Sequence, residues 1–143
     1  MYSELTLEKY SQVLWWGLAH AKGGPFKKSS LILVKYDHLA VPLAEALVRY
    51  LHELDMIPIP RANLTPNMER DFYRLANNKR LTFPIPGDAE LAQGIHGRIS
   101  LIGPGSLDHL SDVDPEAITI ANKGSQYLRA ISQEREQAGD FSW

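Results

Sequence analysis

Cysteine is absent from the 143 residues of this chain. This absence excludes disulfide bonds, zinc sites built on thiolates, and cysteine nucleophiles. A chain without cysteine also suits a reducing compartment, and we expect a cytoplasmic protein.

A surplus of basic charge is missing as well. The chain has 15 Lys and Arg against 17 Asp and Glu, for a formal net charge of -2. Its basic clusters, Lys27-Lys28 and Lys79-Arg80, are short. Proteins that bind nucleic acid need a basic stripe that neutralises phosphates, so we expect no nucleic-acid partner.

Long hydrophobic runs are also absent. No apolar run approaches the roughly 18–20 residues needed to span a bilayer. Residues 1–7 lack the basic region and apolar segment of a signal peptide. The sequence therefore predicts a soluble protein with no membrane partner.

No complete catalytic motif occurs in the chain. Its 5 histidines never show the H-E-x-x-H spacing of a helical zinc site. The nucleophile elbow G-x-S-x-G is missing, and no Walker-type lysine follows the glycine-rich stretch at 103–106. We therefore predict no catalytic residue, no cofactor-binding residue and no metal ligand in this chain.

The chain does contain short apolar runs rich in branched aliphatic residues. Those at 31–34, 56–59 and 99–102 predict strands buried on both faces, as in a parallel sheet covered by helices. A weaker candidate at 81–85 contains Pro84, which restricts it to a sheet edge. Pro58 lies inside the second run, and we expect it to perturb the pairing there.

Helical patterns lie between these runs. Apolar residues recur every three or four positions over 7–21, and a second amphipathic stripe covers 43–54. Together with the runs, these patterns predict an α/β fold. We expect a mostly parallel sheet of about four strands covered by helices, in a single layered domain.

Two further helices are signalled by their start sites. Thr65-Pro66 and Asp114-Pro115 each place a capping residue before a proline in the first helical turn. We expect Phe72 and Leu75 to face inward from the first of these helices. The second is expected to end near Gly139.

Asp37 and His38 directly follow the strand expected from Leu31 to Tyr36, at the end where open parallel sheets gather ligands. A paired Asp and His could orient an imidazole for base chemistry. The alternative is an exposed loop pair that helps to start the next helix. The lack of a third catalytic group nearby favours this alternative.

Two other segments invite a ligand-binding interpretation. The stretch 108–114 offers three carboxylates and His109, which could hold a hard cation, but Asp114 also serves as a helix cap. The stretch 103–106 could cradle a phosphate, but Pro104 removes a backbone donor. Turn and capping roles are the better account of both segments.

Two tryptophans stand side by side in the first helix. Adjacent helical residues point about 100° apart, so we expect Trp15 in the core and Trp16 at its boundary. Trp16 is then a candidate for a protein interface. At the other end of the chain, Phe141 and Trp143 alternate around a serine, as residues of a further strand would.

Several segments, in this order and spacing, resemble the N-terminal portion of the thermophilic-type metallo-aminopeptidases, the aminopeptidase T or leucyl aminopeptidase-like family. They are Leu7-Glu8-Lys9-Tyr10, Pro42-Leu43-Ala44-Glu45-Ala46-Leu47, Arg98-Ile99-Ser100-Leu101-Ile102-Gly103, Val113-Asp114-Pro115-Glu116, Leu128-Arg129-Ala130-Ile131 and Arg135-Glu136-Gln137-Ala138-Gly139.

The resemblance implies that residues 1–143 are the non-catalytic α/β domain of a larger enzyme. A domain beyond residue 143 would bind two divalent metal ions, zinc or cobalt, and release N-terminal amino acids from peptides. None of the family's metal ligands matches a position here. This chain would contribute access to the active site and packing within a homodimer, with Trp16, His38 and His109 as candidate cleft or interface residues.

Two other functions remain open from the sequence. The chain could be a stand-alone α/β domain that binds a small ligand near Asp37 and Gly103. It could also be an assembly domain that dimerises through Trp16.

Overall fold

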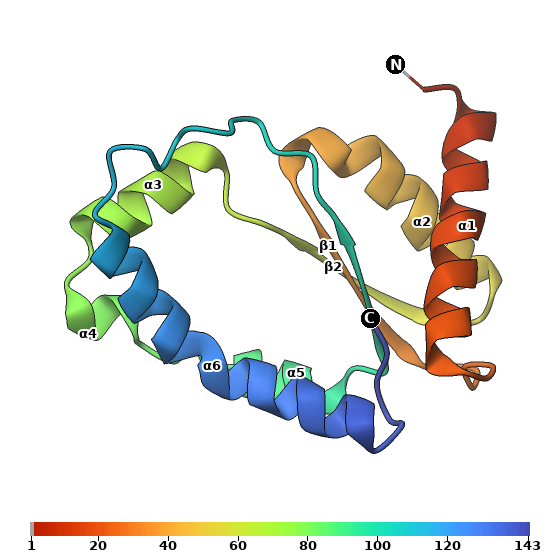
Figure 1. The fold of residues 1–143 in the computed structure, drawn as a ribbon. Helices are drawn as coiled ribbons and strands as arrows, with labels where there is room; N and C mark the ends of the chain where they lie inside the picture. The colour runs from red at the N-terminus through yellow and green to blue at the C-terminus, as the bar shows by residue number, and fades with distance from the viewer. Residues whose placement is uncertain (1) are drawn as a thin grey trace.

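The computed structural model describes residues 2–143 as an α/β structure. Its three strands form a parallel sheet in the order β2-β1-β3, with helices on both sides (Figure 1). The predicted fold class is confirmed. In chain order the elements are α1 (Glu4–Lys22), β1 (Leu31–Tyr36), the short 3-10 helix η1 (His38–Ala40), α2 (Val41–Glu53), β2 (Ile57–Ala62), α3 (Pro66–Leu75), α4 (Asn78–Leu81), α5 (Asp88–Gly94), β3 (Gly97–Leu101) and α6 (Pro115–Gln137).

Local capping explains where the long helices begin and end. The Thr65 side chain accepts a hydrogen bond from the Met68 N–H at the start of α3, and the Asp114 side chain accepts one from Glu116 at the start of α6. Both predicted caps are confirmed. Helix α1 ends at Gly23, whose φ of 78° lies in the left-handed region that glycine adopts without strain.

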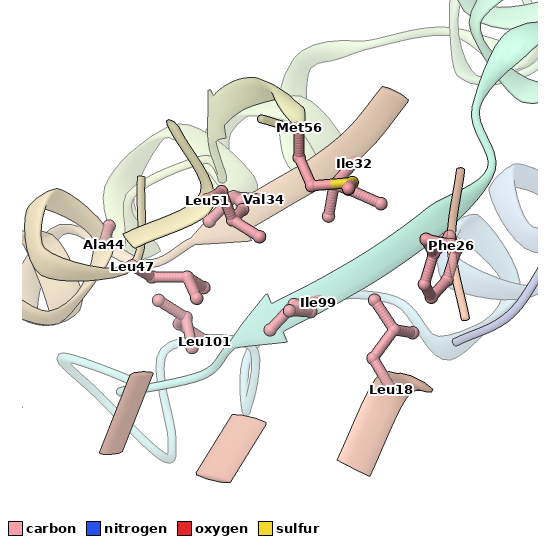
Figure 2. Close-up of a cluster of buried hydrophobic side chains, with 10 residues drawn as sticks. All are labelled: Leu18, Phe26, Ile32, Val34, Ala44, Leu47, Leu51, Met56, Ile99 and Leu101. Atoms are coloured by element: carbon pink, nitrogen blue, oxygen red, sulfur yellow. The ribbon is translucent and has the colours of Figure 1, made fainter. Parts of the chain in front are cut away.

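The main core lies between one face of the sheet and helices α1 and α2. Figure 2 shows Ile32 and Val34 of β1 beside Ile99 and Leu101 of β3, with Leu47 of α2 packed over them. Alternate residues of a strand point to the same face of the sheet, so these strand side chains all face α1 and α2 and are buried there. The other members of this cluster are Leu18, Phe26, Ala44, Leu51 and Met56.

The second face of the sheet has a smaller apolar cluster. Leu33 packs there with Ile95 and Phe141, and Leu31, Ile59 and Leu91 lie around them. Arg135 of α6 joins the helices on this side, because its guanidinium donates to the carbonyl oxygens of Ala92 and Ile95 at the end of α5. The buried apolar side chains of this face thus lie mainly near the amino ends of the strands, because the cluster includes Leu31, Leu33 and Ile95.

The prolines of β2 do not disturb its pairing with β1, so the expected perturbation at Pro58 is wrong. Pro58 and Pro60 are in regular register opposite Ile32 and Val34. The backbone N–H of Ile57 donates to the carbonyl of Ser30, just before β1, and that of Asn63 to the carbonyl of Tyr36, so this alternation turns the proline nitrogens toward the free edge. Pro is tolerated at such an edge and blocks further pairing there.

The weak strand candidate at 81–85 does not form. Asn77 caps the short helix α4 by accepting from the Arg80 N–H, and Leu81 ends that helix as a buried residue. The following residues form a turn that reaches Gly87, whose φ is 92°. Helices α4 and α5 were not anticipated from the sequence.

Helix α3 presents the opposite face to the one expected. Leu75 is 70% exposed and Phe72 is also exposed, whereas Glu69, Arg70 and Tyr73 are partly buried. Figure 1 shows the reason, since α3 lies beside the start of α6 and away from the sheet. The prediction that Phe72 and Leu75 face inward is wrong.

The last residues extend along β3. The Ser142 N–H donates to the His96 carbonyl, and the Arg98 N–H donates to the Ser142 carbonyl, which makes an isolated parallel bridge between Gly97 and Ser142. Phe141 is buried and Trp143 is exposed. The expected strand-like alternation is present at these residues as a single bridge.

Candidate functional site at the carboxyl ends of the strands

The loops after β1 and β3 meet beside the end of β2 and form an open cleft of about 800 Å³. The strand order causes this, because the chain leaves β1 toward β2 on one side and later returns to β3 on the other. Ligands of open α/β sheets collect at such a reversal, outside the carboxyl ends of the strands. The residues that line the cleft come from the three loops and from α3 and α5: Lys35, Asp37, His38, Ala62, Asn63, Leu64, Pro66, Glu69, Ile85, Asp88, Ile102, Pro104, Gly105, Ser106 and His109.

Asp37 ties the three strand ends together. Its Oδ1 accepts a hydrogen bond from Asn63 Nδ2 at 2.9 Å, and its Oδ2 accepts one from the Gly103 N–H at 2.8 Å. Asn63 follows β2 and Gly103 lies just beyond β3. Both carboxylate oxygens are therefore used to hold the cleft in shape.

His38 is exposed at the start of η1 and lies against the loop that follows β3. An ideal Cβ on Gly105 would be 2.8 Å from Cε1 of the His38 ring, so only glycine fits here without displacing the imidazole. Asp37 directs its oxygens to Asn63 and Gly103, not to this ring. Asp37 therefore does not orient the His38 imidazole, and the Asp–His arrangement that could serve as a general base is not formed.

His109 lies in the same cleft and is paired with a residue that the sequence did not indicate. Its Nε2 donates to Oε1 of Glu69 in α3 over 2.7 Å. Its Nδ1 is buried and has no hydrogen-bond partner among residues 2–143. The structure thus places His38 and His109 in one cleft, and the hydrogen bond to Glu69 of α3 holds the His109 ring in position.

A neighbouring ion pair holds the loop that carries His109. Arg70 Nη2 donates to Asp112 Oδ2 at 2.6 Å, and this hydrogen bond holds the pKa of the Asp112 carboxyl below its usual range. Burial and the nearby Glu69 carboxylate raise the pKa of Tyr73. Asp112 lies in a turn, as expected, and its side chain adds this ion pair to α3.

The three carboxylates of 108–114 point to separate partners. Asp108 accepts from the Ser106 hydroxyl, Asp112 from Arg70, and Asp114 from the Glu116 N–H. A divalent cation needs several ligands that converge on one point. Across residues 2–143 no three His, Asp or Glu side chains gather in that way, so the residues present do not fit a metal pair.

Trp16 lies outside this cleft, on the exposed side of α1. Its side chain is 65% exposed and stacks on His20, with ring centroids 5.1 Å apart. Trp15 instead packs against Phe26 beside the main core. Trp15 is the more buried of the two, at the edge of the core, and Trp16 is more exposed than the expected boundary position. The interface role of Trp16 stays a prediction.

The fold and the cleft together define a layered α/β domain with a polar cleft at the carboxyl ends of a parallel sheet. Residues 3–143 match the sequence model of the family described as "Thermophilic metalloprotease (M29)". The chain belongs to this family, and the resemblance seen in the sequence is confirmed.

A solved structure shares this fold. Wild-type AmpT from Thermus thermophilus aligns with a TM-score of 0.62 and 17% sequence identity. The alignment covers 90% of this chain and 32% of that one, so the chain spans about a third of the length of AmpT. At this identity the likeness shows the fold alone. No curated protein matches the sequence significantly.

Within residues 2–143 no helix has the length and apolar character needed to cross a bilayer.

Proposed function

We propose that this chain is the N-terminal, non-catalytic α/β domain of a metal-dependent aminopeptidase. The family match over residues 3–143 supports the peptidase assignment. One observation supports placing the metal chemistry in another domain. Among residues 2–143, no three acidic or imidazole side chains converge on a point where they could bind a metal ion. A metal-binding domain beyond residue 143 would then supply the ions, zinc or cobalt, that activate water.

This domain would shape access to the active site and pack against the rest of the enzyme. An apolar stripe on α3 supports the packing role, because its side chains are exposed at helical spacing. The stripe is formed by Met68, Phe72 and Leu75, with Leu64 just before the helix. The cleft with His38 and His109 would face the peptide substrate.

Asp37 and Gly103 argue against a stand-alone ligand-binding domain at that point. The backbone N–H of Gly103 and the Asp37 carboxylate bond to each other. They are therefore not free to hold a ligand. The cytoplasmic location and the homodimer remain parts of the proposal, the latter supported by the exposed Trp16.

Peptidase activity tests the proposal. Hydrolysis of aminoacyl chromogenic substrates is measured with added Zn²⁺ or Co²⁺ for the 143-residue chain and for the protein encoded by its intact gene. We expect turnover by the intact protein and none by the chain alone, with circular dichroism as the check on folding. Turnover by the pure, folded chain would contradict the proposal, as would an inactive, folded and metal-loaded intact protein.

A further inference from the structure

Basic residues gather on the second face of the sheet, although the sequence scatters them. Lys35 in β1 is the direct Cα partner of Arg61 in β2. Arg98 in β3 is the partner of Leu33, two residues before Lys35 on the same face. This face of the sheet therefore carries a cation from each strand, with Lys35 and Arg61 near the carboxyl ends of β1 and β2 and Arg98 near the amino end of β3.

A fourth cation reaches the same place from α6, which Figure 1 shows running along this side of the molecule. Arg129 lines one hollow of about 540 Å³ together with Lys35, Arg61 and Arg98. We call this the basic hollow. Polar groups of α6 complete its wall: Ser125, Ser132 and Gln133.

Acidic groups do not neutralise these cations. The ion pairs within 4.0 Å among residues 2–143 involve Lys28, Arg49, Arg70 and His109, and none of the four cations of the basic hollow. Asp88 is the acidic side chain in the lining. Like charges on directly opposed strand positions destabilise a sheet, so an anion bound here would remove an unfavourable contact.

Arg98 is held in position for such contacts. Its guanidinium lies over the Trp143 ring, 4.5 Å from the centroid, and the stacking limits its motion. Arg98 is partly buried, and this burial lowers the pKa of its guanidinium. A planar guanidinium fixed in this way is suited to bind oxyanions through two N–H groups.

We propose that the basic hollow binds a small anion that carries two or more negative charges, such as a phosphate group or a polycarboxylate. Four cations against one carboxylate favour a multiply charged ligand over a single carboxylate. The hollow lies between the sheet and α6, and its volume of about 540 Å³ suits a small molecule. The proposal does not depend on the peptidase role, although the hollow shares Lys35 and Asp88 with the carboxyl-end cleft.

Calorimetric titration with inorganic phosphate and, separately, with citrate tests the proposal, in chloride buffer at matched ionic strength. We expect saturable binding of at least one of the two anions, and the preferred one identifies the source of charge. Arg129→Gln changes an exposed helix residue and is expected to weaken binding about tenfold, because one charge-assisted hydrogen bond is lost. Lys35→Gln should weaken it comparably.

The matched control is Lys9→Gln, which removes the same charge from an exposed position on α1 and should leave the affinity unchanged. Two results would overturn the proposal. One is the absence of saturable binding by either anion. The other is an equal loss of affinity in Lys9→Gln and Arg129→Gln, which would mean that binding follows net charge alone.

Discussion

Asp37 and His109 are the residues through which the cleft is built. Asp37 bonds to residues 26 and 66 positions away in the chain, and His109 to one 40 positions away. The sequence placed Asp37, His38 and His109 at loop positions after apolar runs. It could not reveal Asn63, Glu69 or Gly103 as partners, because those contacts depend on strand order and on where α3 lies.

Replacing Asp37 tests its role as a tie between strands. Asp37→Ala removes the acceptor for both the Gly103 N–H and the Asn63 amide. Leaving such partly buried donors unpaired costs about 1–3 kcal/mol of unfolding free energy, measurable by urea denaturation. Asp71→Ala, an exposed change in α3, is the control and should cost less than about 0.5 kcal/mol. Equal unfolding free energies for Asp37→Ala and Asp71→Ala would show that the hydrogen bonds of Asp37 do not stabilise the fold.

His96 gives the fold a pH dependence of known sign. Its Nδ1 accepts a hydrogen bond from the Leu31 N–H at 2.9 Å, which requires an unprotonated nitrogen. Burial, with the charges of Arg135 and Lys22, lowers the pKa of His96, and Asp140 opposes this shift. Because the folded pKa is lowered, the stabilisation is complete above the unfolded value of about 6.5 and is lost as pH falls through the folded value.

The test compares thermal unfolding of the protein and of His96→Asn from pH 7.5 to pH 5. The wild type should lose more stability over this range than the variant, since Asn can accept the Leu31 hydrogen bond and does not titrate. His52→Asn, at an exposed site on α2, should behave like the wild type. Parallel curves for wild type and His96→Asn would show that His96 is not linked to stability.

At the scale of elements, the starts of α3 and α6 could be predicted from the sequence, whereas the buried face of α3 could not. The caps Thr65 and Asp114 depend on neighbours within three positions, so the sequence contained all the information needed. The buried face of α3 depends on the loop before α6, some forty residues later in the chain, where His109 and Asp112 bind Glu69 and Arg70. The strand expected at 81–85 does not form, because Asn77 starts a short helix that includes Leu81.

Two glycines in helices lead to opposite predictions. A Cβ at Gly124 of α6 would be 2.8 Å from the Thr82 Cα just after α4, whereas Gly17 of α1 has nothing within 4 Å. Gly124→Ala should therefore destabilise the protein by about 1–3 kcal/mol through overpacking. Gly17→Ala should stabilise it by about 0.5–1 kcal/mol through helix propensity. Chemical denaturation measures both, and a stabilising Gly124→Ala would contradict the close contact between α4 and α6.

On the scale of the whole molecule, the chain leaves apolar groups exposed on two sides. Trp16 and Val13 lie on α1, and the α3 stripe lies elsewhere on the surface. Exposed aromatic residues of this kind often mark contacts with another protein or domain.

Light scattering measures whether Trp16 joins two copies. We expect a dimer of the intact protein, and a shift toward monomer in Trp16→Ser because a large apolar contact is lost. Tyr2→Ser changes another exposed aromatic residue and serves as the control. An unchanged mass in Trp16→Ser would exclude this surface as the dimer contact.

A titration with divalent metal ions tests whether residues 1–143 can hold a catalytic metal by themselves. Residues 2–143 contain no cluster of three or more acidic or histidine side chains that could hold a metal ion, and His109, Asp112 and Asp114 already have partners, so calorimetric titration of the metal-free chain with Zn²⁺ or Co²⁺ should show no tight stoichiometric site. Binding of one or two ions at submicromolar concentration, lost on replacing His109 or Asp112, would show that the chain holds the metals itself.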